Sequence, residues 1–315
     1  MQLQTGELKA IAHMFKNILV LYLSIQRGKM LEMLIYPQKA EKKPWQMFFI
    51  GAFYATISLI LVKWIFSGDP VLSKYTGILV VTFCVMFSIP FMYYALRNEE
   101  EKDLELKGFS RLMKEHGKAL LYFMFLFMGF IVAFSFWYIV FSDGNQNFRA
   151  QIETYCIINK PAYFEECVAE YGVKHVSKTT AFLTAKEKIV NIFANNIYVL
   201  LFTIVFSLIF GAGAIFILAW NASVISAAIG IFSESSLINL PLGIARYMIH
   251  GVPEILSYFA GALAGGIVSV AIIKHDVHSE KFWIILQDSL NLVIAAVVIL
   301  FIAALIEVFI TPVLF

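Results

Sequence analysis

The sequence predicts an all-α integral membrane protein with six full transmembrane helices and one re-entrant helical hairpin. Apolar residues make up 60% of the 315 positions, well above the roughly 45–50% of soluble domains. They occur in blocks of about 20 residues, the length that a helix needs to cross about 30 Å of hydrocarbon. The five tryptophans fall at or near the ends of these blocks, as interfacial aromatic belts require. The full spans are expected at 45–66, 75–96, 119–141, 197–219, 252–273 and 290–310.

Residues 1–44 precede the first span and form an amphipathic cytoplasmic segment rather than a signal peptide. Leu8, Ile11, Phe15 and Ile18 recur at helical spacing, and no short apolar region with a small-residue cleavage site is present. The segment is expected either on the membrane surface with its lysines toward water or docked on the protein's own core. Periodicity alone leaves both options open.

The first two spans belong to an N-terminal extension, residues 45–118, and basic residues orient it. Seven Lys or Arg precede the first span, and six lie in the short loop 97–118. By the positive-inside rule, the amino terminus and this loop are cytoplasmic. The sequence therefore predicts a multi-pass protein of the cell membrane with a cytoplasmic N-terminus.

The loop 142–196 follows the third span and is then extracytoplasmic. It contains Cys156 and Cys167, which form a disulfide if the compartment is oxidising. Two free thiols are the alternative, and sequence position does not exclude it.

Residues 220–251 admit two interpretations. The apolar run 222–232 is too short to cross, and a polar turn and a second short helical stretch to His250 follow, which is typical of a re-entrant hairpin. The alternative is a seventh full span at about 222–242. Lys274 and Lys281 favour seven spans because their loop would then be cytoplasmic, whereas Arg246 favours six.

Small residues predict close helix packing at two places. Gly261, Gly265 and Gly266 form a cluster in the fifth span, and Gly211 and Gly213 interrupt the fourth or mark a bend in it. Small residues let helix backbones approach closely where lipid offers no hydrophobic drive. Contacts inside one chain are favoured over a dimer interface.

Two glutamates, Glu254 and Glu307, lie in or against apolar spans, where an unpaired charge is costly. One turnaround loop separates their spans, so both are expected at the same membrane face. We expect them to form one polar cluster with His250 and, if the hairpin exists, Asn221. The cluster is either a static network or a site that shares a proton or takes up a cation. Glu254 also follows Pro253, and that pair is typical of a helix start.

Catalytic and cofactor motifs are absent from the sequence. No Gly-rich phosphate loop, HExxH zinc motif or Gly-x-Ser-x-Gly elbow occurs. We expect no enzyme activity, no cofactor and no metal site, and the net charge of +2 gives no indication of nucleic-acid binding.

Residues 119–315 resemble the stage II sporulation protein M family of integral membrane proteins. The resemblance rests on these segments: Asn195-Asn196, Gly211 with Gly213, Asn221, His250 to Ile255, Gly261 to Gly266, and Ile306 to Pro312. Ala222 stands where an Asn-Gly turn is expected. The two extra spans resemble longer archaeal versions. The resemblance implies a non-enzymatic membrane protein. In sporulating bacteria the namesake works with cell-wall-degrading partners during engulfment.

These observations rank three classes of function. A scaffold that assembles membrane or cell-envelope partners comes first, with the lipid bilayer as its environment and a homo-oligomer as a compatible form. A channel or transporter for an ion or small solute comes second, because a hairpin and intramembrane glutamates resemble the broken helices of transporters. An intramembrane enzyme comes last, since it would need a nucleophile or metal.

Overall fold

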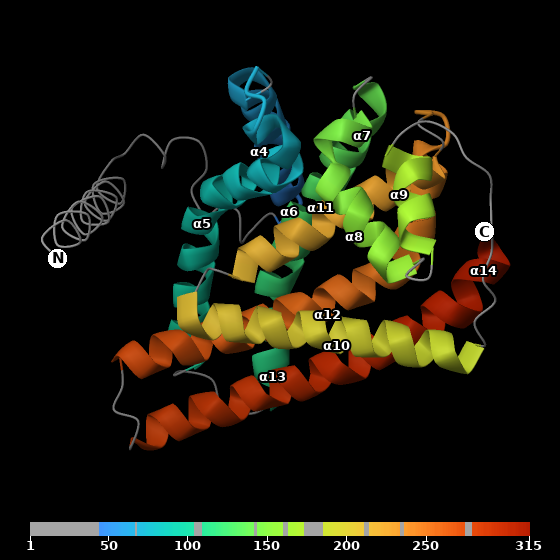
Figure 1. Cartoon of the computed structure of the whole chain (residues 1–315). Helices are drawn as coiled ribbons and strands as arrows, with labels where there is room; N and C mark the ends of the chain where they lie inside the picture. The colour runs from blue at the N-terminus through green and yellow to red at the C-terminus, as the bar shows by residue number, and fades with distance from the viewer. Residues whose placement is uncertain are drawn as a thin grey trace, which may run out of the picture. The chain divides into compact units, whose positions relative to one another are not determined.

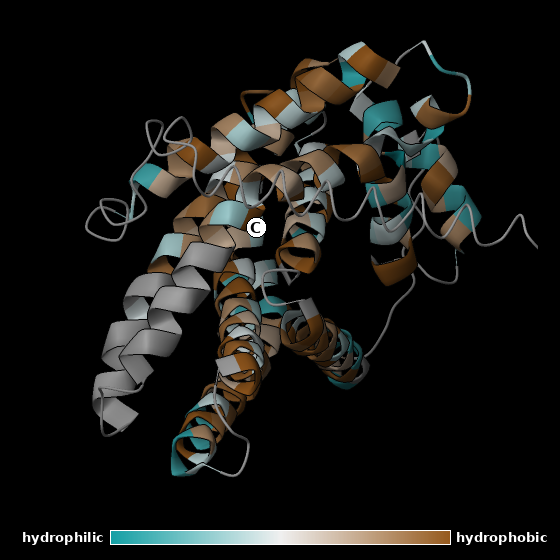
Figure 2. Cartoon of the chain, turned by 90° about the vertical axis from the view of Figure 1, so that its left-hand side faces the viewer, coloured by the Kyte–Doolittle hydropathy of each residue, from teal (hydrophilic) through white to brown (hydrophobic). Residues whose placement is uncertain are grey.

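The computed structural model describes residues 44–66, 68–103, 109–141, 144–159, 163–172, 185–210, 214–233, 236–274 and 279–315. Seven helices in these residues are long and apolar enough to cross a membrane. Figure 2 shows apolar residues along these long helices and hydrophilic residues mainly near helix ends. The all-α membrane class is therefore confirmed. The amphipathic segment expected at 1–44 lies outside the described residues except for Pro44.

Helix α6 (Phe109–Val140) forms the centre of the core, with α4 (Gln46–Phe66) and α5 (Thr76–Asp103) beside it. A stripe of phenylalanines at helical spacing, Phe123, Phe127, Phe130 and Phe134, is almost completely buried. Phe123 stacks on Phe259 of another span with 5.4 Å between the ring centroids. Such aromatic pairs contribute about 0.5–1.5 kcal/mol beyond their buried area. The stripe fixes which face of α6 points inward.

Helix α4, the first span, is joined to α6 by a glycine crossing that the sequence did not reveal. Gly51 of α4 faces the backbone of Leu126 and Gly129 in α6. A Cβ on Gly129 would meet the carbonyl oxygen of Phe48 and come within 2.7 Å of the amide nitrogen of Ala52. The two backbones are in direct contact there, and only glycine permits that distance.

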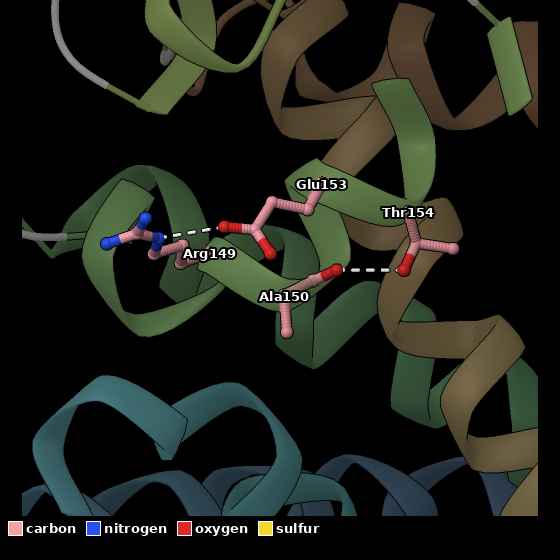
Figure 3. A network of polar contacts seen from close by, with 4 residues as sticks. All are labelled: Arg149, Ala150, Glu153 and Thr154. Carbon is pink, nitrogen blue, oxygen red and sulfur yellow. Dashed lines mark hydrogen bonds and ion pairs between the residues drawn. The ribbon is translucent and has the colours of Figure 1, made fainter. Parts of the chain in front are cut away.

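The described residues between α6 and the next span form three short helices: α7 (Gly144–Asn147), α8 (Arg149–Asn159) and α9 (Phe164–Gly172). A disulfide joins Cys156 of α8 to Cys167 of α9, with 5.8 Å between the Cα atoms. On α8, Arg149 Nε donates to Glu153 Oε1 at 2.9 Å, and the Thr154 hydroxyl donates to the Ala150 carbonyl at 2.8 Å (Figure 3). We call α7–α9 (144–172) the platform.

The fourth span expected at 197–219 is instead divided between two helices. Helix α10 (Ala185–Phe210) ends where Gly211 begins, and α11 (Ala214–Phe232) starts one residue after Gly213. Gly211 and Gly213 lie outside the described residues. Both glycines stand between the two described helices, and glycine is about 1 kcal/mol less favourable than alanine inside a helix. Trp220, expected at a span end, consequently lies inside α11.

The path of α11 contradicts the re-entrant hairpin that was predicted from the sequence. Ser226 of α11 donates to the carbonyl of Ile131 in α6 at 3.1 Å, and Gly230 faces the ring of Tyr138 farther along α6. Residue numbers rise together on the two helices, so α11 runs parallel to α6. Its 19 residues extend about 28 Å, close to the hydrocarbon thickness. The geometry thus supports the seven-span alternative, with a span at Ile215–Phe232 rather than about 222–242.

Helix α12 (Leu240–Lys274) is continuous through Pro253, where a new helix was expected to begin. Proline there removes the hydrogen bond to the carbonyl of Ile249, four residues earlier, but neighbouring helices in a membrane protein tolerate such a loss. The final spanning segment consists of α13 (Glu280–Leu305), a π-helical turn η3 (Ile306–Ile310) and α14 (Thr311–Leu314). Helices α10, α12 and α13 run side by side (Figure 1).

The predicted glycine cluster in α12 lies against α10. A Cβ on Gly265 would come within 2.6 Å of the carbonyl oxygen of Ile204 and 3.0 Å of the Ser207 Cβ, whereas one on Gly261 would meet mainly the flexible side chain of Leu200. Gly266 is also buried. The Ser207 hydroxyl donates to the Ala262 carbonyl at 2.5 Å. Together these contacts join α10 and α12 at backbone distance.

Replacement of Gly129 by Ala should lower stability in detergent by roughly 1–3 kcal/mol, because the new methyl group meets backbone atoms that cannot move aside. Thermal unfolding of the purified protein measures this. Gly117→Ala is the matched control in the same helix, since a Cβ there meets nothing within 4 Å. It should leave the unfolding temperature unchanged or raise it. Equal effects of the two substitutions would contradict the crossing.

Leucine at either Gly261 or Gly265 should destabilise the protein, and alanine should distinguish the two sites. Gly265→Ala should cost roughly 1–3 kcal/mol because its methyl group meets the backbone of α10. Gly261→Ala should cost less, since the Leu200 side chain can rotate. Chemical or thermal unfolding in detergent measures the two losses of stability. A larger loss for Gly261→Ala than for Gly265→Ala would show that α10 and α12 do not touch at Ile204.

Candidate functional site

Glu254 lies on α12 and is held by an asparagine of α10. The Asn196 side-chain nitrogen donates to Glu254 Oε1 at 2.6 Å. Asn196 is buried and Glu254 is half-buried. The glycine contacts at Gly261 and Gly265 lie farther along the same pair of helices, so they set the separation at which this bond forms. An amide donor to a carboxylate is a charge-assisted hydrogen bond, which is stronger than a neutral one.

The final span brings Glu307 to the same level as Glu254. His250 Nδ1 and Thr311 Oγ1 are 3.2 Å apart, and each lies one helical turn from a glutamate, four residues before Glu254 and four after Glu307. Helix α12 and the final span are antiparallel, so the two glutamates lie at the same level along these two helices. Their carboxylates interact electrostatically.

Glu307 lies in a π-helical turn at 306–310. Glu307 is half-buried and is the second residue of this turn. The Thr311 backbone N–H donates to the Ile306 carbonyl, which is the five-residue spacing of a π turn, and the Thr311 hydroxyl donates to the same carbonyl at 3.3 Å. Such a turn carries one residue more than an α turn and is frequent at functional sites. It lets Thr311 be buried against His250.

Three of the four residues predicted for the cluster are therefore together: His250, Glu254 and Glu307. Asn221 has a different hydrogen-bond partner, because its side-chain nitrogen donates at 2.7 Å to the Ile217 carbonyl of its own helix. The hairpin that would have carried Asn221 to the cluster is instead the spanning helix α11. From here on, the term polar cluster refers to Asn196, His250, Glu254, Glu307 and Thr311.

Sequence reasoning did not assign Asn196 and Thr311 to this cluster, although both lie in segments that carry the family resemblance. Their proximity to the glutamates follows from the packing of α10, α12 and the final span, which the sequence alone does not show. Tyr258, one turn beyond Glu254, was also missed. It is buried and interacts electrostatically with both carboxylates.

Arg246 flanks the cluster. Arg246 lies one turn before His250, and its Nη1 donates to the Phe315 carbonyl at 3.2 Å. Its guanidinium also lies 4.8 Å from the ring centroid of Phe232. Arg246 thereby joins the end of α11, the start of α12 and the end of the final span at one face.

Two facing carboxylates restrict what the polar cluster can do chemically. Their repulsion is relieved by a shared proton or by a bound cation, and the Asn196 amide satisfies one oxygen without neutralising charge. Groups of three or more His, Cys, Asp and Glu that could hold a metal ion are not found in the described residues. The arrangement is suited to a structural hydrogen-bond network or to reversible uptake of a proton or a simple cation.

Comparison with protein families gives one match. The model of the family described as stage II sporulation protein M matches residues 119–312. This region begins in α6 and includes every residue of the polar cluster, while α4 and α5 precede it. No curated protein and no solved structure matches the chain.

The hydrogen bond between Asn196 and Glu254 should couple the two residues energetically. In a double-mutant cycle with Asn196→Ala and Glu254→Ala, we expect a coupling of roughly 1–2 kcal/mol, because either single change removes the same charge-assisted bond. Denaturant unfolding in detergent measures it. Tyr198→Ala, paired with Glu254→Ala, is the control on the same helix and should be additive, because the Tyr198 side chain is 65% exposed and lies outside this hydrogen-bond network. Additivity in both cycles would mean that Asn196 does not hold Glu254.

Proposed function

The chain belongs to the stage II sporulation protein M family, and from this premise we propose that it is a non-enzymatic membrane scaffold. In this proposal the platform of α7–α9 receives partner proteins on the extracytoplasmic face. The spans position the platform, and the polar cluster holds three of those spans together.

The observation that carries the proposal is the rigid attachment of the platform to the membrane helices. Gln151 of α8 is completely buried, and its amide donates to the Gly77 carbonyl at the start of α5 and to the Ser223 hydroxyl of α11, at 3.0 and 3.2 Å. Tyr155 of α8 is hydrogen bonded to Tyr247 of α12. Three spans thus hold α8, and the disulfide joins α9 to it.

The platform also carries the kind of surface that partners use. Ile157 and Ile158 are 58% and 47% exposed, and Tyr163 is 38% exposed. Glu165 and Glu166 beside them are exposed acidic residues. Exposed apolar side chains rimmed by charge are typical of interaction sites. A partner with a basic rim and apolar contacts fits this surface.

The disulfide and the basic residues support one orientation of this face. A disulfide forms in an oxidising compartment, and three candidate spans precede the platform. A platform outside the cytoplasm then requires a cytoplasmic N-terminus, which agrees with the basic residues before the first span and in the loop 97–118. In this orientation the cell membrane is the proposed location.

A second candidate function, transport or channelling of a proton or cation, is favoured by one observation. Glu254 and Glu307 interact electrostatically and both are half-buried rather than sealed. Intramembrane carboxylate pairs of this kind occur in ion pathways. The same pair also fits a static network, because Asn196 satisfies Glu254 and the adjacent His250–Thr311 contact joins the same two helices.

A photoreactive amino acid at Ile158 should give discrete protein adducts in intact cells if the platform receives partners. The charge-reversed variant Glu165→Lys with Glu166→Lys should reduce those adducts, because the acidic rim is lost while the buried Gln151 and the disulfide are untouched. Gel mobility of cross-linked protein measures both. The control position is Ile60, which is 43% exposed on α4. Adducts that are equal at both positions, or unchanged by charge reversal, would refute a platform for partners.

The transport alternative has a separate test in a thermal-shift experiment. If the pair binds a cation, then Na⁺, K⁺ or Ca²⁺ should raise the unfolding temperature of the purified protein at constant ionic strength, with choline as the balancing ion. Glu254→Gln and Glu307→Gln should abolish that rise. No ion-specific shift in the wild type would leave the static network as the role of the pair.

A further inference from the structure

Arg246 lies where the ends of three spans meet. Its guanidinium is 4.8 Å from the ring centroid of Phe232, the last residue of α11. Its Nη1 donates at 3.2 Å to the carbonyl of Phe315, which follows α14. Arg246 itself stands six residues after the first residue of α12, about 9 Å along the helix axis. The end of α11, the start of α12 and the end of the final span therefore converge on this side chain.

The length of α11 gives the depth of Arg246 in the membrane. The candidate span Ile215–Phe232 has 18 residues and extends about 27 Å, close to the hydrocarbon thickness of about 30 Å. Phe232 thus marks the edge of the hydrocarbon. The span Leu240–Ile273 has 34 residues and extends about 51 Å, so its first turns reach beyond that edge. A guanidinium in contact with Phe232 lies at the level of the lipid headgroups.

The charge of Arg246 is not balanced within the part of the chain that the structure describes. A guanidinium has five N–H donors, and the bond to Phe315 uses one. Among the described residues, no carboxylate forms an ion pair with Arg246 and no second acceptor bonds to it. The side chain is half-buried, so water solvates it only in part. A planar guanidinium with free donors binds phosphate oxygens through two parallel hydrogen bonds.

Exposed apolar side chains lie on both sides of this cation. Leu242, one turn before Arg246 on the same side of α12, is 53% exposed. Val313 and Leu314, directly before Phe315, are 82% and 59% exposed. A ligand that fits this surface carries an anionic group at the headgroup level and apolar chains beside it.

We propose that Arg246 binds the phosphate of a phospholipid in the leaflet on the platform's side of the membrane. The side is given by the next residue, Tyr247, which is hydrogen bonded to Tyr155 of the platform. The acyl chains contact Leu242, Val313 and Leu314. Basic side chains between spans are an established means of binding lipid headgroups, and here the bound lipid joins the three span ends.

This lipid site goes beyond the proposed scaffold function, because it includes neither the exposed surface of the platform nor the glutamate pair. Partner adducts at Ile158 test the scaffold and do not depend on Arg246. Loss of either result without the other therefore separates the two proposals.

Native mass spectrometry of the whole chain in detergent tests the site with three probes. Phosphatidylglycerol carries the phosphate as its one charged group, and diacylglycerol with the same acyl chains lacks it. We expect the wild type to bind phosphatidylglycerol roughly tenfold more tightly, the range of one hydrogen bond to a charged group. Glycerol 3-phosphate, which has the phosphate without acyl chains, should not be retained.

Two matched substitutions locate the binding. Arg246→Gln should weaken phosphatidylglycerol binding roughly tenfold and leave diacylglycerol binding unchanged. Arg149→Gln removes the same charge from an exposed residue of the platform that is paired with Glu153, and it should change neither. Arg246→Lys keeps the charge and should bind phosphatidylglycerol more tightly than Arg246→Gln. Formation of the Cys156–Cys167 disulfide reports correct folding in each variant.

Three results would each overturn the proposal. Equal affinity of the wild type for phosphatidylglycerol and diacylglycerol needs no variant, and it is also the result expected if the carboxylate of a partner protein occupies Arg246. Equal phosphatidylglycerol affinity of Arg246→Gln and Arg149→Gln would place the lipid elsewhere. Retention of glycerol 3-phosphate as tight as that of phosphatidylglycerol would identify a site for free phosphate compounds instead of a lipid.

Discussion

The backbone contact between α10 and α12 at Gly265 is the constraint on which the rest of the membrane domain depends. Lipid is as apolar as a leucine side chain, so helices in a membrane associate by close packing and hydrogen bonds rather than by hydrophobic burial. The glycine allows α10 to approach until the carbonyl of Ile204 lies 2.6 Å from the position of an added Cβ. At that separation the short side chain of Asn196 reaches Glu254, and a larger residue at 265 would leave the carboxylate without its donor.

The polar cluster then connects the packing of the spans to the platform. Glu307 interacts electrostatically with Glu254 and with Tyr247, whose hydroxyl is hydrogen bonded to Tyr155 of α8. The neighbouring residue of Tyr155 is Cys156, which carries the disulfide to α9. A continuous set of contacts therefore runs from the glycine contact to the platform surface. In the scaffold proposal this continuity has a simple purpose, because a surface that positions partners has to keep a fixed geometry relative to the membrane.

The sequence was sufficient for the parts of this architecture that depend on local pattern. Apolar blocks of membrane length gave the spanning helices, and the costly placement of Glu254 and Glu307 indicated a shared polar site. It was misleading where local rules compete with tertiary packing. Pro253 normally starts a helix, yet α12 continues through it, and the short apolar run 222–232 was mistaken for a hairpin because α11 begins before it, at Ala214. Gly51 and Gly129 are far apart in the sequence and lie in no recognisable motif, so their crossing could not be foreseen without the structure.

Ion flux in proteoliposomes tests the central claim most directly, which is that the glutamate pair holds a scaffold together and does not conduct. The purified protein would be reconstituted into liposomes that contain dyes sensitive to H⁺, Na⁺ or K⁺ and then exposed in turn to a gradient of each ion. The account predicts fluxes equal to those of protein-free liposomes for the wild type and for Glu254→Gln. A wild-type flux that disappears in Glu254→Gln, while the variant still forms its Cys156–Cys167 disulfide, would contradict the scaffold and establish a conducting pathway through the pair.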